Sequence, residues 1–426
     1  MECVILRFMQ HTSIYYHIPF CRKRCGYCDF NTFAGLSRFI PAYVDAICQE
    51  IEIVGSLQKT AETVHTCFFG GGTPSLLKVE QVSQIITATR RSFEVCQGAE
   101  ITLEANPGTV TRESVEGYVA SGVNRFSFGM QSASPDDLRI LDRTHSFEQV
   151  VDAVKFCKMS GIEHINLDLI FGIPGQSMER WRTTLERAVE TGIDHLSVYG
   201  LTIEEGTPMY RWVEKGALAA PDDDQAADMY EAASEFLLKQ GFEQYEISNW
   251  ARGESAQCKH NLQYWRYQPY YGFGAGAHGF VNGVRTENVA LVPEYLQRMK
   301  EHRSAVYPAS PAVKEVNNLS WWDQAQEMMM VGLRMTQSGV SMRDFRSRFG
   351  IEIGDAFEGQ VRRLKEEGLV ELVETPEKAL RLTRKGRLLG NRVFLEFVGN
   401  EEPEHLTQVT RRTPARKYHN RPYSSH

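Results

Sequence analysis

The sequence predicts an α/β protein. Its first half should form a partial (β/α)6 barrel of the TIM type, followed by a C-terminal extension and a small winged-helix-like domain. Three observations lead to this fold class. Six short apolar runs alternate with helical patterns in the first half. The composition, 42% hydrophobic and 24% charged, is that of an ordinary globular protein. A length of 426 residues is enough for two or three domains.

The apolar runs of the first half are each as short as a typical strand, and helical patterns lie between them. The segment 38–55 is one such helix, because its apolar residues recur at steps of three and four. Strands that alternate with helices form a parallel sheet with right-handed crossovers. Six units are fewer than a closed barrel needs, so we expect a partial barrel, with a doubly wound open sheet as the alternative. The predicted strands are 14–18, 64–69, 101–103, 123–128, 165–170 and 196–201.

The second half is organised differently. A helical stretch, 225–239, precedes a loop-rich region with many aromatic residues and glycines. The segments 343–350, 353–368, 369–373 and 380–383 then follow the order helix, helix, strand, strand, which is a winged-helix-like layout. Its eleven basic and nine acidic residues between 341 and 390 are too balanced for a DNA-binding surface. We expect a barrel domain at 1–205, an extension at 206–305, a winged-helix-like domain at 306–400 and a disordered basic tail at 401–426.

The charge and the termini limit the class of protein. The chain has 47 Lys and Arg against 54 Asp and Glu, a net charge of −7, which argues against nucleic-acid binding through a broad basic surface. No apolar stretch is long enough to span a membrane, and the N-terminus lacks the layout of a secretory signal. We therefore expect a soluble, cytoplasmic protein. From Arg411 the tail holds five basic and no acidic residues. A solvated tail is favoured, and peripheral contact with an anionic membrane or an acidic partner is the alternative.

Nine cysteines in a long chain, an odd number, do not fit a disulfide framework. Three of them, Cys21, Cys25 and Cys28, fall within eight residues, directly after the first predicted strand. Thiolates so close together suit zinc or an iron–sulfur cluster. A structural zinc site takes four ligands, usually as two separated pairs, and no fourth Cys or His follows nearby. Three ligands on a four-iron cluster leave one iron open, and the basic stretch 22–24 would offset the negative charge of the cluster. A zinc loop is the minor alternative.

Polar residues gather where the other predicted strands end. A glycine-rich turn, Gly70-Gly71-Gly72-Thr73, follows the second strand, and such a turn lets the backbone approach a ligand. Glu104 and Gln131 follow the third and fourth strands, and Asp168 lies within the fifth. Because the carboxyl ends of barrel strands form one rim, these residues together predict a pocket. Taken singly, each could equally be a cap or a buried ion pair.

These motifs resemble those of the radical S-adenosylmethionine superfamily, since CxxxCxxC follows the first strand of a barrel-like pattern. The wider string from His17 to Phe30 resembles the coproporphyrinogen-dehydrogenase-like branch, and within it the HemW-type haem chaperones. The resemblance covers about 14–397 and implies a [4Fe–4S] cluster on Cys21, Cys25 and Cys28. It implies that S-adenosylmethionine is bound by Tyr15, Tyr27, Gly71, Gly72, Thr73, Glu104, Gln131, Arg143, Asp168 and Gly200.

A second motif lies in the extension. The segment 259–265, Lys-His-Asn-Leu-Gln-Tyr-Trp, matches the HNxxYW pattern that typifies the haem-chaperone branch, and His278 follows in a glycine-rich loop. Seven aromatic residues lie between 264 and 280. Histidine is a common axial ligand of haem iron, and aromatic rings offer flat faces to a porphyrin. The resemblance makes His260 the first candidate ligand and His278 the second. Without it, packing or capping roles would be favoured. Cys258, two residues before His260, is ambiguous.

Three functions compete. The favoured one is a haem chaperone that carries a [4Fe–4S] cluster and S-adenosylmethionine and passes haem to an acceptor protein. The alternatives are an oxygen-independent coproporphyrinogen III dehydrogenase and another radical enzyme acting on a tetrapyrrole. By resemblance, dehydrogenases carry a further cysteine two residues after the third ligand, where this chain has Phe30. We therefore expect no coproporphyrinogen dehydrogenase activity.

Overall fold

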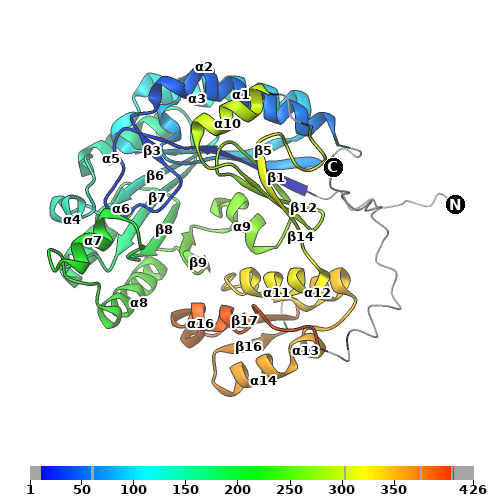
Figure 1. Ribbon diagram of the computed structural model, residues 1–426. Helices are drawn as coiled ribbons and strands as arrows, with labels where there is room; N and C mark the ends of the chain where they lie inside the picture. The colour runs from blue at the N-terminus through cyan, green and yellow to red at the C-terminus, as the bar shows by residue number, and fades with distance from the viewer. Residues whose placement is uncertain (1–10, 59–61, 302–303, 375–376, 404–405, 407–426) are drawn as a thin grey trace. The chain divides into compact units, whose positions relative to one another are not determined.

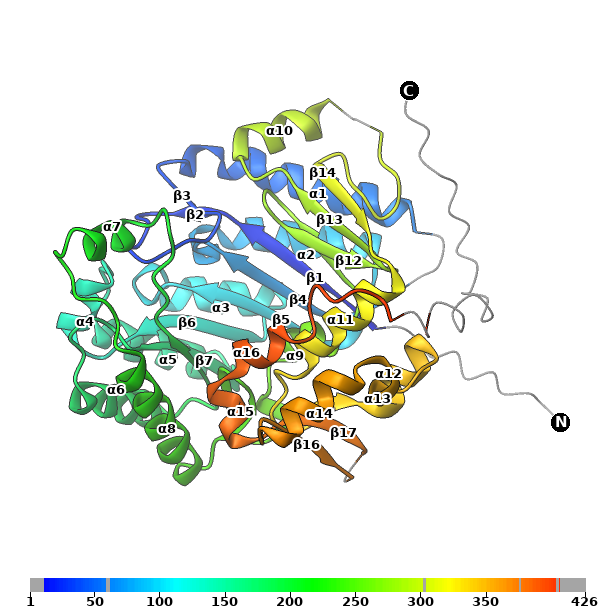
Figure 2. The same cartoon turned by 60° about the horizontal axis from the view of Figure 1, so that its bottom comes forward.

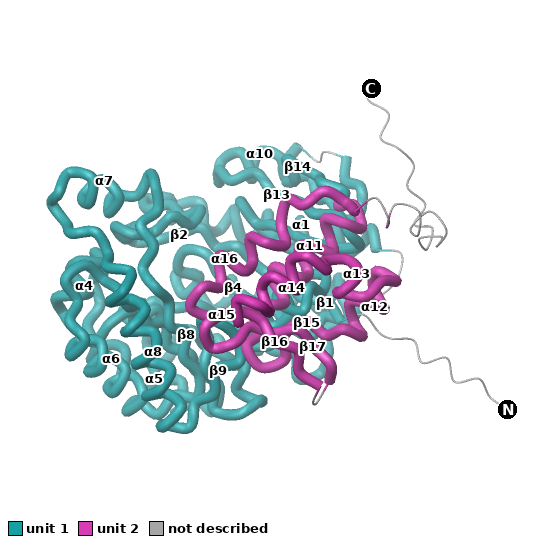
Figure 3. The backbone as a smooth tube through the Cα atoms, turned by 90° about the horizontal axis from the view of Figure 1, so that it is seen from below, with its two compact units in different colours: residues 1–318 teal, residues 319–426 magenta. Residues whose placement is uncertain are grey.

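The computed structural model describes residues 11–406 except 59–61, 302–303, 375–376 and 404–405. The chain divides into two compact units, residues 1–318 and residues 319–426 (Figure 3). Each unit has its own sheet and helices. Most of the predicted basic tail at 401–426 lies outside the described residues.

The first unit is built on the six predicted strands, which are all present and pair in parallel in chain order. The order of strands in the sheet is linear, so the sheet is an open, partial barrel, as predicted. Five of the six strands are longer than the predicted apolar runs, because residues that flank the runs also join the ladder. The strands are β1 (His11–Ile18), β4 (Thr63–Gly71), β5 (Glu94–Ala105), β6 (Arg125–Gln131), β7 (His164–Phe171) and β8 (His195–Gly200).

Helices form a layer on one face of this sheet. Neighbouring helices pack against each other in chain order, and Figures 1 and 2 show them following the curve of the strands. On α1 the apolar residues at steps of three and four are buried, as the periodicity predicts. The helices of the first unit are α1 (Ile40–Ser56), α2 (Val79–Ser92), α3 (Arg112–Ser121), α4 (Pro135–Ile140), α5 (Phe147–Met159), α6 (Met178–Glu190), α7 (Pro208–Glu214), α8 (Asp223–Lys239), α9 (Lys259–Trp265) and α10 (Val292–Lys300).

The region after β8 extends the same sheet at both ends. β11 (Tyr270–Phe273) pairs in parallel with β1, and three antiparallel strands follow it outward: β12 (His278–Val281), β13 (Val284–Asn288) and β14 (Val313–Asn318). At the other end β10 (Asn249–Ala251) pairs with β8, and β9 (Glu243–Glu246) pairs with β10. β1 is therefore an interior strand, which explains why almost all of its residues are buried.

One short helix of this region, α9, lies on the other side of the sheet. It contacts β1 and β4, and Figure 1 shows it on the face opposite α1 and α2. The HNxxYW motif therefore faces the inside of the partial barrel, against side chains of the first two barrel strands.

The second unit contains the predicted succession of helices and strands. The predicted helix 353–368 is divided into two at Phe357, whose backbone leaves the helical conformation (φ −130°, ψ 38°). Trp322, Met328 and Met329 are buried in the core of this unit. The elements are α11 (Trp321–Gly332), β15 (Val340–Ser341), α12 (Met342–Phe349), α13 (Ile353–Ala356), α14 (Glu358–Glu366), β16 (Val370–Val373), β17 (Ala379–Leu382), α15 (Arg384–Leu388) and α16 (Gly390–Leu395).

Among the described residues, none of the helices is both long enough and apolar enough to cross a lipid bilayer.

Candidate functional site

The cysteine loop follows β1 at the carboxyl end of the sheet. Cys21 lies on the short strand β2 (Phe20–Cys21), which pairs with β3 (Phe33–Ala34), and Cys25 and Cys28 follow in the loop between them. Each thiol has a polar neighbour: Thr73 Oγ1 lies 3.7 Å from Cys21 Sγ, Arg143 Nη1 3.5 Å from Cys25 Sγ, and Thr32 Oγ1 3.9 Å from Cys28 Sγ. Burial raises the pKa of Cys21, and the nearby Cys28 and Cys25 raise it further.

These surroundings fit an iron–sulfur cluster. The donor set is three soft thiols that lie close enough to influence one another electrostatically. Among the described residues, no three His, Cys, Asp or Glu side chains converge enough to hold a single metal ion. In a four-iron cluster each thiolate takes a different iron, so the thiols need not converge on one point. The donor set of three thiols is therefore compatible with a four-iron cluster.

The cation that faces the thiols is Arg143, which lies more than a hundred residues from them in the chain. The predicted source of positive charge, Arg22, Lys23 and Arg24, is exposed to solvent. Lys23 forms an ion pair with Asp142 instead. Arg143 is held by a 2.7 Å hydrogen bond from Nη2 to the carbonyl of Gly129, which directs Nη1 toward Cys25. Its charge can therefore stabilise the negative charge of thiolates.

The glycine-rich turn packs directly on the cysteine loop. A Cβ atom on Gly72 would lie 2.7 Å from the carbonyl oxygen of Phe20 and 3.0 Å from Cys21 Sγ. Gly71 has a positive φ of 113°, and a Cβ atom there would lie 2.7 Å from the ring of His17. Glycine is thus required at both positions so that β4 can end against the cysteine loop.

Two half-buried carboxylates, Glu104 and Asp168, lie beside this turn. Glu104 Oε2 accepts a 3.1 Å hydrogen bond from the backbone N–H of Gly71. Asp168 accepts hydrogen bonds from Ser127 Oγ (3.1 Å) and Asn166 Nδ2 (2.8 Å). Burial raises the pKa of Glu104 to about 8, the negative charge of Asp168 adds to the shift, and the Gly71 hydrogen bond opposes it. Glu104 and Asp168 therefore place two carboxyl groups, close enough to influence each other electrostatically, at this rim of the sheet.

The other residues predicted to bind S-adenosylmethionine lie along the same rim. Tyr15 OH is 3.0 Å from His17 Nδ1. Burial raises the pKa of Tyr27, the charge of Arg143 opposes this shift, and the nearby Cys25, Cys28 and Asp168 add to it, so Tyr27 lies close to the thiols and to Arg143. Gln131 is buried at the end of β6, close to Gly129 and Arg143. Gly200 ends β8, where its nearest neighbour is the ring of Phe171.

Two residues near the site were missed from the sequence. Tyr199 lies on β8 at the same rim, is 41% exposed, and is close enough to Asp168 for the carboxylate charge to act on its phenol. Successive side chains of a strand point to opposite faces of the sheet, so Tyr199 faces the same side as Ser197, two residues before it. This alternation in the sequence could have identified Tyr199. Glu100 accepts hydrogen bonds from the backbone N–H groups of Lys259 (3.2 Å) and His260 (3.0 Å). A carboxylate at the start of a helix stabilises it, so Glu100 fixes the position of α9.

His260 is enclosed by the chain. Its side chain is 1% exposed, Nδ1 lies 2.8 Å from Thr66 Oγ1, and Nε2 lies 3.0 Å from Tyr264 OH. The ring of Phe68 stacks on it with centroids 4.9 Å apart. Burial lowers the pKa of His260 to about 3, so the imidazole is neutral, as ligation of a metal requires.

The other two candidates around the haem motif differ from His260. The side chain of His278, on β12, is 55% exposed, and Nε2 lies 3.9 Å from Glu287 Oε1. Cys258 is buried, and its Sγ lies 3.6 Å from Glu100 Oε1. Burial raises the pKa of Cys258 to about 12, so its thiol stays protonated and is a poor metal ligand.

The raised pKa of Glu104 predicts a dependence of stability on pH. Between about pH 4.5 and 8 the folded protein keeps a proton on Glu104 that the unfolded chain has lost. The unfolded state then binds fewer protons, so the free energy of unfolding falls as the pH rises through this window. Glu104→Gln has no such proton and should gain stability relative to wild type across the same range. Urea unfolding of both proteins from pH 4.5 to 8 measures the difference. The exposed Glu94, as Glu94→Gln, is the control, and a constant difference for Glu104→Gln would refute the assignment.

Comparison with known proteins agrees with this geometry. Residues 15–188 match the family model described as Radical SAM superfamily, and residues 319–389 match the HemN C-terminal domain. A Bacillus subtilis protein named heme chaperone HemW is 36% identical over 389 residues, which is 91% of this chain and 99% of that protein. A Mycobacterium tuberculosis protein of the same name is 42% identical over 66% of this chain and 72% of its own length.

More distant relatives extend the comparison. A zebrafish protein named radical S-adenosyl methionine domain-containing protein 1, mitochondrial, is 35% identical over 76% of this chain and 73% of its own. The solved structure of coproporphyrinogen III oxidase (HemN) from Escherichia coli has a TM-score of 0.77 and 24% identity, covering 92% of this chain and 90% of that one. That likeness concerns the fold. Membership of the radical SAM superfamily implies S-adenosylmethionine and a [4Fe–4S] cluster as cofactors. The near full-length identity to the Bacillus subtilis protein shows that the chain belongs to the HemW family of the radical S-adenosylmethionine superfamily.

Proposed function

We propose that this protein is a haem chaperone, which binds haem and passes it to an acceptor protein. The observation that carries the proposal is the 36% identity to the protein named heme chaperone HemW over 91% of this chain. The placement of the HNxxYW motif supports it, since α9 brings His260 to the inner face of β1 and β4. His260 is the leading haem ligand in this proposal, and His278 is the second candidate.

The cofactor residues are part of the same proposal. Cys21, Cys25 and Cys28 would hold the [4Fe–4S] cluster, with Arg143 balancing their charge. When bound, the cluster supplies an electron to S-adenosylmethionine. The two carboxylates Glu104 and Asp168 would accept hydrogen bonds from the amino groups of S-adenosylmethionine. The full set of residues proposed to bind it is Tyr15, Tyr27, Gly71, Gly72, Thr73, Glu104, Gln131, Arg143, Asp168 and Gly200.

Haem titration tests the function. Purified full-length protein, kept anaerobic, is expected to bind a single haem per chain with a Soret band, and to lose that haem to an apo-haemoprotein added in excess. His260→Ala should weaken binding by roughly tenfold or more, because the iron loses an axial ligand. His164→Ala, at the start of β7, serves as the control histidine. A larger loss in His278→Ala than in His260→Ala would move the ligand to His278.

A second assay distinguishes the haem-chaperone proposal from the alternative that the protein is a coproporphyrinogen III dehydrogenase. The reconstituted protein is incubated with coproporphyrinogen III and S-adenosylmethionine under anaerobic, reducing conditions. We expect no protoporphyrinogen. Its formation would replace the chaperone proposal with the enzymatic one, and wild-type protein that binds no haem would remove the chaperone proposal altogether.

A further inference from the structure

The imidazole of His260 has no free nitrogen in this structure. Nδ1 is hydrogen-bonded to Thr66 Oγ1 and Nε2 to Tyr264 OH, at 2.8 Å and 3.0 Å. The ring is 1% exposed and lies against Phe68, with an interplanar angle of 23°. A nitrogen that is hydrogen-bonded in this way cannot at the same time bind iron. If His260 is the haem ligand, one of the two hydrogen bonds must be given up.

Thr66 is the partner that cannot leave. It lies in the middle of β4, between β1 and β5, and its side chain is fully buried. Its hydroxyl also lies 2.5 Å from Ser13 Oγ on β1. To release His260, Thr66 would have to break contacts on two interior strands of the sheet.

Tyr264 is the partner that can leave. It lies one turn after His260 on α9, a helix of seven residues. Its side chain is half-buried, and its ring packs edge-on against the half-buried Tyr270, with centroids 4.7 Å apart. A change of side-chain rotamer at a partly exposed residue is fast and leaves the helix in place.

We propose that Tyr264 caps Nε2 of His260 until haem binds, and that Thr66 holds the ring through Nδ1. The inference rests on the proposed haem-chaperone function. The lone pair of Nε2, which accepts the Tyr264 hydroxyl proton in the free protein, becomes the pair that binds iron. The tyrosine keeps its proton and turns away, so no proton or electron is released. Nδ1–H donates to Thr66 Oγ1, and the Thr66 hydroxyl can in turn donate to Ser13.

The two residues then have different roles. Tyr264 competes with iron for Nε2. Its hydroxyl gives Nε2 a hydrogen bond while no haem is bound, and it turns away to free Nε2 when haem binds. Thr66 is a positioning residue, since a ligating histidine whose other N–H is held by an oxygen has a defined tautomer and a more basic ligating nitrogen. Haem would therefore bind to an imidazole ring that is already oriented. Binding would require the loss of one neutral hydrogen bond, the one between Tyr264 and Nε2.

Tyr264→Phe tests the cap. The variant keeps the ring and removes the hydroxyl, so Nε2 loses its competing donor. Full-length, anaerobically purified variant should bind ferric haem roughly three- to tenfold more tightly than wild type and associate faster, which is the range of one neutral hydrogen bond. Tyr118→Phe removes a buried hydroxyl from α3 in the outer helical layer and is the matched control. Unchanged or weaker haem binding in Tyr264→Phe would overturn the proposal.

Thr66 is tested by the reduction potential of bound haem. Thr66→Val removes the acceptor of Nδ1–H, makes the imidazole a weaker donor to ferric iron, and should raise the potential. Thr66→Ser keeps the hydroxyl and should restore the wild-type value. Equal potentials in the valine and serine variants would contradict the positioning role.

The outcomes also separate the cap from the proposed function. If wild-type protein binds no haem, the proposed function fails. If wild type binds haem, His260→Ala loses it and Tyr264→Phe changes nothing, only the cap fails.

Discussion

Replacing Cys21, Cys25 and Cys28 together by serine is expected to abolish the iron–sulfur absorbance of anaerobically reconstituted protein. The three thiols are the soft donors of the site, and a hydroxyl is a much poorer ligand for iron. Each thiol has a polar neighbour from a different part of the chain: Thr73, Arg143 and Thr32. Because these neighbours remain, the loop should still fold in the variant, and the loss should be specific to the cluster. The measurement is the visible absorbance near the charge-transfer bands, together with the iron and sulfide content.

Cys96→Ser is the matched control. Cys96 is a half-buried thiol on β5 and has no part in the proposed cluster. Its substitution should leave the absorbance and the iron content unchanged. If the triple variant retained wild-type absorbance, the cluster would have to be held by other cysteines, and the assignment would be wrong.

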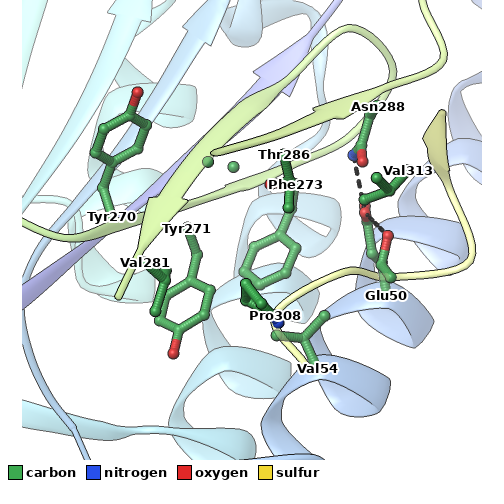
Figure 4. A pocket seen from close by; sticks show the side chains of 13 residues that line it. Glu50, Val54, Tyr270, Tyr271, Phe273, Val281, Thr286, Asn288, Pro308 and Val313 are labelled. Atoms are coloured by element: carbon green, nitrogen blue, oxygen red, sulfur yellow. Dashed lines mark hydrogen bonds between the residues drawn. The ribbon is translucent and has the colours of Figure 1, made fainter. Parts of the chain in front are cut away.

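Glu50→Ala is expected to destabilise the first unit by about 3 kcal/mol or more. Glu50 lies on α1 and is 1% exposed, and four donors from residues 274–310 surround its carboxylate. Figure 4 shows one of them, Asn288, beside Glu50. Oε1 accepts from Asn288 Nδ2 (2.8 Å) and Ser310 Oγ (2.6 Å), and Oε2 from Gly274 N and Tyr295 OH (both 2.8 Å). Removing the carboxylate leaves several buried donors unsatisfied, each at a cost of about 1–3 kcal/mol. The loss is large against a typical total stability of about 5–15 kcal/mol.

The side chain cannot be replaced by its amide without loss. Each carboxylate oxygen faces an N–H donor, Gly274 on one side and Asn288 on the other. An amide NH2 group would therefore meet a donor in either orientation, and Glu50→Gln should be destabilised as well. The adjacent cavity, about 10 Å³, holds no more than a water molecule, so the role is structural. Urea unfolding measures both variants, and Glu52→Ala, an exposed position on the same helix, is the control. Wild-type stability in Glu50→Ala would show that the four contacts contribute little.

Local sequence patterns were sufficient for the frame of the barrel. The six strands and the amphipathic α1 follow from apolar periodicity, which depends on residues a few positions apart. Periodicity missed the first residues of β5, Glu94–Gly98, because they mix polar and apolar residues and form no apolar run. It also missed β11, whose pairing with β1 joins segments more than 250 residues apart. Such pairings depend on the whole fold and leave no short-range signal.

The candidate site shows the same division. The spacing of Cys21, Cys25 and Cys28 and the glycines after β4 lie within single loops, and the sequence alone pointed to them. The cation beside the thiols could not be found in this way. Adjacency in the chain favoured residues 22–24, whereas the fold directs Arg143 to Cys25 by holding its guanidinium at Gly129. Likewise, the sequence does not distinguish Glu50 from other residues of its helix. Its stabilising role follows from four hydrogen-bond donors that lie far from it in the chain and that the fold places around its carboxylate.

The sequence by itself determined the family-specific motifs, the strand order along the chain and the residues with the chemistry to bind a cluster, a nucleoside cofactor and haem. The tertiary structure decided which of these residues meet. It placed α9 inside the partial barrel, with the ring of His260 6.4 Å from that of Tyr15. It also enclosed His260 between Thr66 and Tyr264, while it left His278 exposed. The physical reason is that a residue's type depends on the sequence alone, whereas its burial and its partners depend on contacts between segments far apart in the chain.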